Sequence, residues 1–64
     1  MPIIRIEMFE GRDRDQKRKI MSEVTDGFCR ATGASPDSVY VILTDVSQDD
    51  WARGGIAFAD RDKS

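Results

Sequence analysis

The segment SVYVILT, at residues 38–44, decides the fold of this chain. Its β-branched and aromatic residues predict a strand. Apolar side chains stand at both odd and even positions of the segment, and a strand with that pattern is usually covered on both faces. Two layers of cover are therefore required, and the chain before this strand supplies only one of them.

The chain before this segment predicts one further strand and one helix. Residues 1–9 are rich in isoleucine and partly alternating, which predicts a strand. Residues 10–12, Glu-Gly-Arg, predict a turn. A helix is expected from residue 14 to residue 32, because apolar side chains recur there at helical spacing. They are Ile20, Met21, Val24, Phe28 and Ala31.

Both ends of this helix carry capping signals. Asp13 is a typical N-cap residue, and Gln16 three positions later completes a capping-box pattern. Gly33 follows the last helical residue, where glycine commonly ends a helix. Pro36 favours the first turn of a short helix just before the second strand.

Two strands joined by one helix predict a βαβ unit with parallel strands and a right-handed crossover. After it, residues 47–51 resemble a short capped turn, and Gly54-Gly55 predicts a reversal with residues 56–58 as a hairpin arm. Residues 60–64 form a charged tail that we expect to fray. The expected fold class is α+β, as a single domain over residues 1–64.

Size and composition indicate that this fold is completed by oligomerisation. A chain of 64 residues has a marginal core, and small domains usually add disulfides, a metal or partner subunits. One cysteine forms no internal disulfide, and a chain without histidine offers no plausible zinc set. One helix also covers only one sheet face, so another copy of the chain must cover the other.

Charge and hydropathy exclude several functions. Lys and Arg number 10 against 12 Asp and Glu, which argues against a nucleic-acid or membrane-surface binder. No apolar run approaches the roughly 20 residues that span a bilayer, and no signal peptide opens the chain. The lone Cys29 fits a reducing cytoplasm, where we expect the protein to reside.

Pro2 is the candidate catalytic residue. If an aminopeptidase removes Met1, the ring nitrogen becomes a secondary amine. An α-amino group has a pKa near ~8, and burial beside cations lowers it toward neutrality, which suits a general base. Retained Met1 would make this nitrogen an amide, which is no base at neutral pH. The competing interpretation is a tolerated residue at a chain end.

The chain resembles the 4-oxalocrotonate tautomerase family from Pro2 to about Ala59. The resemblance depends on fixed offsets from an N-terminal proline, since none of its motifs is specific alone. The matching features are Pro2, Glu10-Gly11-Arg12, Asp15-Gln16-Lys17, Ser38-Val39 and Gly54-Gly55.

This resemblance implies a fold, an assembly and a reaction. It implies a βαβ subunit with a C-terminal hairpin, assembled as a homohexamer that is a trimer of dimers. It implies that the proline moves a proton within 2-hydroxymuconate or a related dienol acid of aromatic degradation, without cofactor or metal. A small carboxylate is then the substrate partner.

The resemblance also assigns roles to Arg12 and Trp51. Arg12 stands where the family keeps an arginine that grips a substrate carboxylate, which a planar guanidinium does with two hydrogen bonds. Its charge would also help to hold Pro2 unprotonated. Trp51 stands where an aromatic residue walls the site against water. The competing roles are a solvated arginine and a core or interface anchor.

Tyr40 is the main departure from the family pattern, which places a second arginine there. A phenol brings no positive charge at pH 7, and losing that charge could cost ~2–4 kcal/mol of transition-state stabilisation. Arg53 is the first candidate for a replacement cation and Arg5 a weaker one. Arg53 is otherwise an exposed turn residue.

The residues at positions 53 and 9 argue against a related hydrolytic function. Related dehalogenases carry a glutamate where Arg53 stands and an arginine where Phe9 stands, so hydrolytic dehalogenation is not expected.

The expected substrate-binding set is Trp51, Tyr40, Arg53 and Phe9. Because of Tyr40, a non-catalytic oligomer or one subunit of a hetero-oligomeric tautomerase remains the alternative. An unrelated interaction module would require the offsets from Pro2 to be coincidental.

Overall fold

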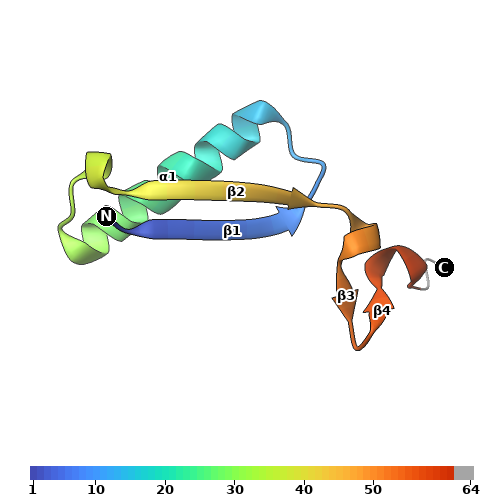
Figure 1. The fold of residues 1–64 in the computed structure, drawn as a ribbon. Helices are drawn as coiled ribbons and strands as arrows, with labels where there is room; N and C mark the ends of the chain where they lie inside the picture. The colour runs from blue at the N-terminus through green and yellow to red at the C-terminus, as the bar shows by residue number, and fades with distance from the viewer. Residues whose placement is uncertain (62–64) are drawn as a thin grey trace.

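The fold is one helix packed on one face of a two-stranded sheet, with a small hairpin beyond the end of that sheet (Figure 1). The computed structural model describes residues 1–61. The elements are β1 (Ile3–Phe9), α1 (Arg14–Thr32), η1 (Pro36–Ser38), β2 (Tyr40–Val46), η2 (Gln48–Asp50), β3 (Ala52–Arg53), β4 (Ile56–Ala57) and η3 (Phe58–Asp60). The expected α+β class and βαβ order are confirmed.

The helix has the predicted bounds because its two caps form as expected. The Asp13 side chain accepts a hydrogen bond of 2.8 Å from the backbone nitrogen of Gln16. Gly33 takes a left-handed conformation with φ 79°, which a residue with a Cβ atom adopts only at a cost. The prediction was wrong for Ala31, which is exposed and does not extend the apolar stripe.

The two long strands pair in parallel, from Ile3 opposite Tyr40 to Phe9 opposite Val46. β2 starts two residues later than predicted, because Ser38 belongs to the short helix η1 and Val39 caps it. The Val39 nitrogen donates a hydrogen bond of 3.1 Å to the Pro36 carbonyl. β2 also runs two residues further, since its last residues still have partners on β1.

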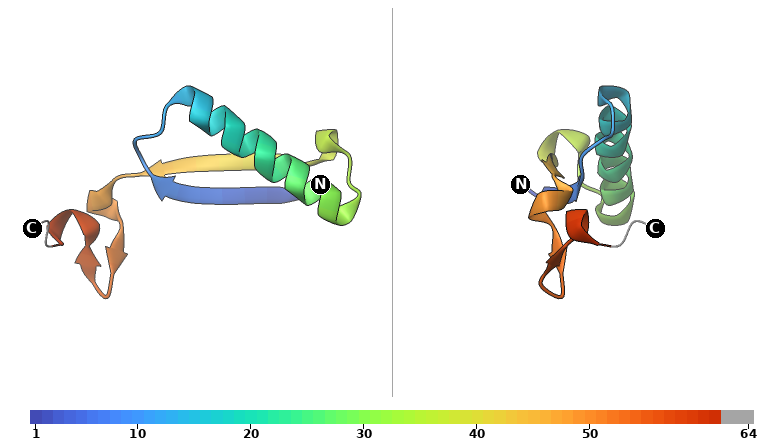
Figure 2. Two further views of the ribbon diagram at one scale, coloured as in Figure 1. Left: turned by 180° about the vertical axis from the view of Figure 1, so that it is seen from behind. Right: turned by 90° about the vertical axis from the view of Figure 1, so that its right-hand side faces the viewer.

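The sheet has one covered face and one open face. Alternate residues point to the same side, so Ile4, Ile6, Val41 and Leu43 face α1, and all four are half-buried. The salt bridge between Lys17 of α1 and Asp45 of β2 lies on the same face, which shows that this is the face covered by the helix. Figure 2 shows no element over the opposite face. There Ile3, Tyr40 and Ile42 are 51%, 51% and 40% exposed.

A single chain is too extended to close a core. Its radius of gyration is 15.2 Å, against about 11 Å for a compact domain of this size. Its accessible surface is 5005 Å², against about 4,100 Å² for a folded monomer of this mass. Within residues 1–61 no side chain is buried. The shape therefore fits a subunit of an oligomer.

The C-terminal segment is better ordered than the sequence predicted. The reversal at Gly54-Gly55, with φ 63° and 83°, pairs Arg53 with Ile56 as expected. The expected strand arm is shorter, because Phe58 begins η3. The prediction of a frayed tail was wrong for Asp60 and Arg61, since the Arg61 nitrogen donates to the Phe58 carbonyl at 3.2 Å. The rest of that tail, residues 62–64, lies outside the described residues.

Candidate functional site

The predicted site residues fall into two groups at opposite ends of β1. Pro2 and Tyr40 lie at its amino end, where the Tyr40 nitrogen donates a hydrogen bond of 2.9 Å to the Pro2 carbonyl. Pro2 is half-buried, whereas Met1 is 84% exposed. The residue that would have to be removed is therefore accessible, and the proline behind it is partly covered.

Three aromatic rings gather at the carboxyl end of β1, and we call them the aromatic cluster. Phe9 ends β1, and its ring centroid lies 4.5 Å from that of Trp51 and 5.3 Å from that of Phe58. The Trp51 and Phe58 centroids are 6.5 Å apart. All three pairs are tilted or edge-on, which is the favoured geometry of aromatic contacts. Trp51 thus stands in an apolar wall, together with the predicted Phe9.

Three arginines surround this end of the sheet. The guanidinium carbons of Arg53 and Arg61 lie 5.7 and 5.1 Å from the Phe58 ring centroid. Arg12 donates from Nη1 to the Phe9 carbonyl at 3.4 Å. In the described part of the chain the ion pairs are Lys17–Asp45 and Arg18–Asp15. None of the three arginines therefore has a carboxylate partner there.

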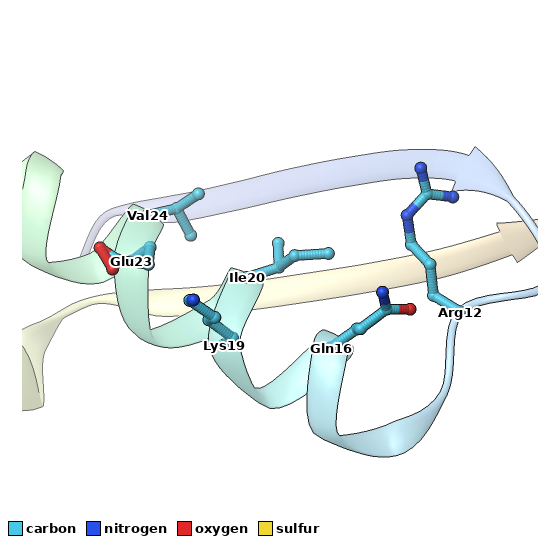
Figure 3. Close-up of a pocket in the computed structure, with 6 residues that line it drawn as sticks. All are labelled: Arg12, Gln16, Lys19, Ile20, Glu23 and Val24. Atoms are coloured by element: carbon cyan, nitrogen blue, oxygen red, sulfur yellow. The ribbon is translucent and has the colours of Figure 1, made fainter.

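Arg12 also borders a groove of about 460 Å³ along α1 (Figure 3). Ile20 and Val24 give it an apolar floor, and the remaining lining side chains are Gln16, Lys19 and Glu23. A smaller hollow of about 250 Å³ adjoins Trp51. Two carboxyl groups stand in its lining, which consists of Glu7, Val46, Asp50, Trp51 and Ala52.

No single chain brings both groups together. β1 has seven residues, and at about 3.3 Å per residue it separates Pro2 from Arg12 by more than 20 Å. The views in Figures 1 and 2 likewise place the N-terminus and the hairpin at opposite ends of the molecule. One small substrate cannot touch Pro2 and Arg12 of the same chain.

Two residues at the aromatic cluster were missed from the sequence, namely Phe58 and Arg61. A signal for Phe58 was present: a tight turn at Gly54-Gly55 pairs residue 53 with 56 and 52 with 57, which brings Trp51 and Phe58 together. The Phe58 nitrogen does donate to the Trp51 carbonyl at 2.7 Å. Arg61 carried no comparable signal, since its place depends on the course of η3.

The sequence pattern of a family described as "Tautomerase enzyme" matches residues 2–61. The chain belongs to the tautomerase family. A relative of this tautomerase from Ralstonia nicotianae, named "Probable tautomerase RSp1151", is 38% identical over 55 residues, which are 86% of this chain and 85% of that protein. The resemblance inferred from the sequence is confirmed, and with it the assignment as an isomerase of the 4-oxalocrotonate tautomerase type.

Solved structures agree with this tautomerase fold. YwhB, a homologue of 4-oxalocrotonate tautomerase, superimposes with a TM-score of 0.90 at 31% identity, covering 95% of this chain and 100% of that one. A chain of a heterohexameric 4-oxalocrotonate tautomerase from Chloroflexus aurantiacus gives 0.86 at 30% identity, covering 94% and 97%. That protein shows that members of the family assemble into oligomers.

No group of three or more His, Cys, Asp or Glu side chains within residues 1–61 is placed to hold a metal ion. Nor does that part of the chain contain a helix long and apolar enough to cross a membrane.

Proposed function

We propose that this tautomerase isomerises enol and dienol carboxylic acids such as 2-hydroxymuconate, with the Pro2 amine as base and then acid. The observation that carries the proposal is that the family pattern begins at Pro2, directly behind the exposed Met1. Removal of Met1 turns the Pro2 nitrogen into a secondary amine on a rigid ring. No cofactor is needed, because the reaction only relocates one proton.

The proposed reaction has two proton transfers. The Pro2 nitrogen takes the proton from the enol hydroxyl and delivers it to a distant carbon of the conjugated chain, so that the enol becomes a conjugated ketone. Arg12 binds a carboxylate of the substrate through two parallel hydrogen bonds. The aromatic cluster keeps water away from the reacting atoms. The Tyr40 phenol donates a hydrogen bond to the oxygen on which negative charge develops.

Such a site has to form between copies of the chain. Pro2 and Arg12 of one chain are too far apart, so the amino end of one β1 must meet the carboxyl end of another. The open face with Ile3, Tyr40 and Ile42 offers an apolar surface for this contact, and the extended subunit leaves room for it. We propose a homohexamer built as a trimer of dimers.

A hetero-oligomer is the second candidate, favoured by two observations. Tyr40 replaces a cation of the family pattern, and the similar protein from Chloroflexus aurantiacus is a heterohexamer. In that case this chain supplies some of the site residues and a related second chain supplies the missing cation. A second, similar chain that copurifies with this one would support it.

The test follows enol loss by ultraviolet absorbance with 2-hydroxymuconate and phenylenolpyruvate. Intact mass is measured first, to establish that Met1 is absent. Pro2→Ala is expected to lower kcat about 100-fold or more, as loss of a general base does. The matched control is Pro36→Ala, an exposed proline in η1, which should keep activity within about twofold. A wild-type oligomer without Met1 that does not accelerate enol loss contradicts the homo-oligomeric enzyme.

A further inference from the structure

We propose that Arg53 and Arg61 form a second carboxylate-binding site beside the aromatic cluster. Arg53 contacts the ligand, and Arg61 is a positioning residue that holds the hairpin carrying Arg53. This inference rests on the proposed tautomerase function and names which substrates it favours: acids with two carboxylates, one bound by Arg12 and the other by Arg53.

The first support is that both guanidinium groups are held on one ring. Their central carbons lie 5.7 and 5.1 Å from the Phe58 centroid, within the roughly 6 Å over which a cation is attracted to an aromatic face. Phe58 in turn packs against Phe9 and Trp51. The two charges therefore adjoin the wall that the proposed reaction uses to exclude water.

The two arginines differ in burial and in whether they bond to the backbone. Arg61 is half-buried and donates from Nη2 to the Arg53 carbonyl at 2.8 Å, while its Nε is buried without a hydrogen-bond partner among the described residues. That bond ties η3 to the hairpin across eight residues. Arg53 is exposed, and within residues 1–61 its guanidinium donates no hydrogen bond. Arg61 is thus committed to the fold, while the guanidinium donors of Arg53 have no partner within residues 1–61.

A carboxylate is the ligand that fits these donors. A guanidinium binds it through two parallel hydrogen bonds, and the adjacent apolar rings strengthen the attraction by excluding water. The hollow beside Trp51 is lined by Glu7 and Asp50, which repel an anion, and Arg53 is not among its lining residues. Arg53 is therefore the group that we assign to the negative charge of the ligand. Arg53 thereby provides, near the carboxyl end of β1, the positive charge that the Tyr40 phenol lacks at the amino end.

The kinetic test compares a substrate with two carboxylates, 2-hydroxymuconate, with one that has a single carboxylate, phenylenolpyruvate. Arg53→Gln is expected to raise KM for the diacid about 10-fold or more and to change KM for the monoacid less than about twofold. Arg30→Gln, the same change at an exposed arginine of α1, is the matched control and should change neither. Equal losses on both substrates, or a diacid-selective loss in Arg30→Gln as well, would overturn the proposal.

The positioning role of Arg61 is tested by a double-mutant cycle. Arg61→Met should show the same diacid-selective loss, and the double variant Arg53→Gln/Arg61→Met should lose little more than Arg53→Gln alone, because Arg61 acts through Arg53. Unfolding is followed in parallel by circular dichroism. Additive losses, or an Arg61→Met loss that falls equally on both substrates, would reject this role even if the variant is also less stable.

A binding measurement separates this site from the proposed catalysis. In the Pro2→Ala background, calorimetry compares cis,cis-muconate with sorbate, which keep a conjugated six-carbon chain but carry two carboxylates and one. We expect Arg53→Gln to weaken muconate binding about 10-fold and to leave sorbate binding unchanged. Arg53-dependent muconate binding without Pro2-dependent turnover would refute the catalytic proposal alone. Pro2-dependent turnover with Arg53-independent muconate binding would refute this site alone.

Discussion

The two ends of β1 differ in how much of their surroundings one chain provides. The carboxyl end is packed against its own hairpin, through the aromatic cluster and the arginines on Phe58. The amino end has Pro2, the exposed Met1 and the exposed side chains of Ile3 and Tyr40. The proposed binding groups are thus assembled within the subunit, whereas the proposed catalytic amine lies at an end that we expect another subunit to complete.

This difference explains how a chain of 64 residues can carry a site at all. A subunit with no buried side chain in its described part cannot enclose a substrate by itself. When one copy's amino end meets another copy's carboxyl end, the same contact covers apolar surface and brings amine and arginine together. Folding and site formation would then depend on the same interface.

The largest expected effect comes from mixing two inactive variants. Pro2→Ala and Arg12→Gln should each lose about 100-fold or more in kcat/KM. When equal amounts are unfolded together and refolded, about a quarter of the sites should combine an intact Pro2 with an intact Arg12 from another subunit. Enol loss followed by absorbance checks this. If both residues acted within one chain, mixing would restore nothing.

The second prediction concerns the open face of the sheet. Ile42→Asp places a charge where a second copy is expected to pack, and an uncompensated buried carboxylate costs several kcal/mol. Sedimentation velocity should show a shift to smaller species. Ser22→Asp adds the same charge on an exposed residue of α1 and serves as the control. An Ile42→Asp protein that sediments like wild type would show that this face is not an interface.

A smaller effect is expected at the aromatic cluster. Phe58→Ala removes the ring that contacts both Phe9 and Trp51, which should lower the free energy of unfolding by about 2 kcal/mol. Ile56→Ala in the same hairpin is the control, because this side chain is 52% exposed. Urea unfolding at one fixed protein concentration compares them. Equal changes in both variants would mean that the cluster contributes no special packing.

The smallest effect is expected at the helix start. Asp13→Ala removes the side-chain bond to the Gln16 nitrogen and should cost about 1 kcal/mol, as loss of an N-cap does. Asp15→Ala removes an exposed ion pair with Arg18 and a first-turn negative charge, but alanine has the higher helix propensity, so it should cost less than about 0.5 kcal/mol. Thermal unfolding of both variants tests the order. If Asp15→Ala is the more damaging, the cap does not set the helix start.

The sequence was sufficient to predict the bounds of an element wherever neighbouring residues alone determine them. Asp13 and Gly33 define both ends of α1, because capping depends only on neighbouring backbone groups. The start of β2 was misplaced, since the Pro36–Ser38 turn and the pairing with β1 compete for the same residues. Pairing between distant strands sets such boundaries, and no single segment contains that information.

The candidate site was predictable only in part. Family offsets indicated Pro2, Arg12 and Trp51, but not that the first of these lies at the opposite end of β1 from the other two. Phe58 and Arg61 were missed because their role depends on the course of the chain after the hairpin. The notion that Arg12 lowers the pKa of Pro2 requires a neighbouring subunit, so it remains a prediction about the assembly.

The open sheet face also bears on how this protein responds to dilution. A subunit that buries no side chain within residues 1–61 is expected to gain most of its stability when copies meet, so the melting temperature should rise with protein concentration. At enzyme levels far below the dissociation constant of the assembly, specific activity should fall because free subunits lack a complete site. Assays at nanomolar and micromolar enzyme would then report different apparent turnover numbers for the same molecule.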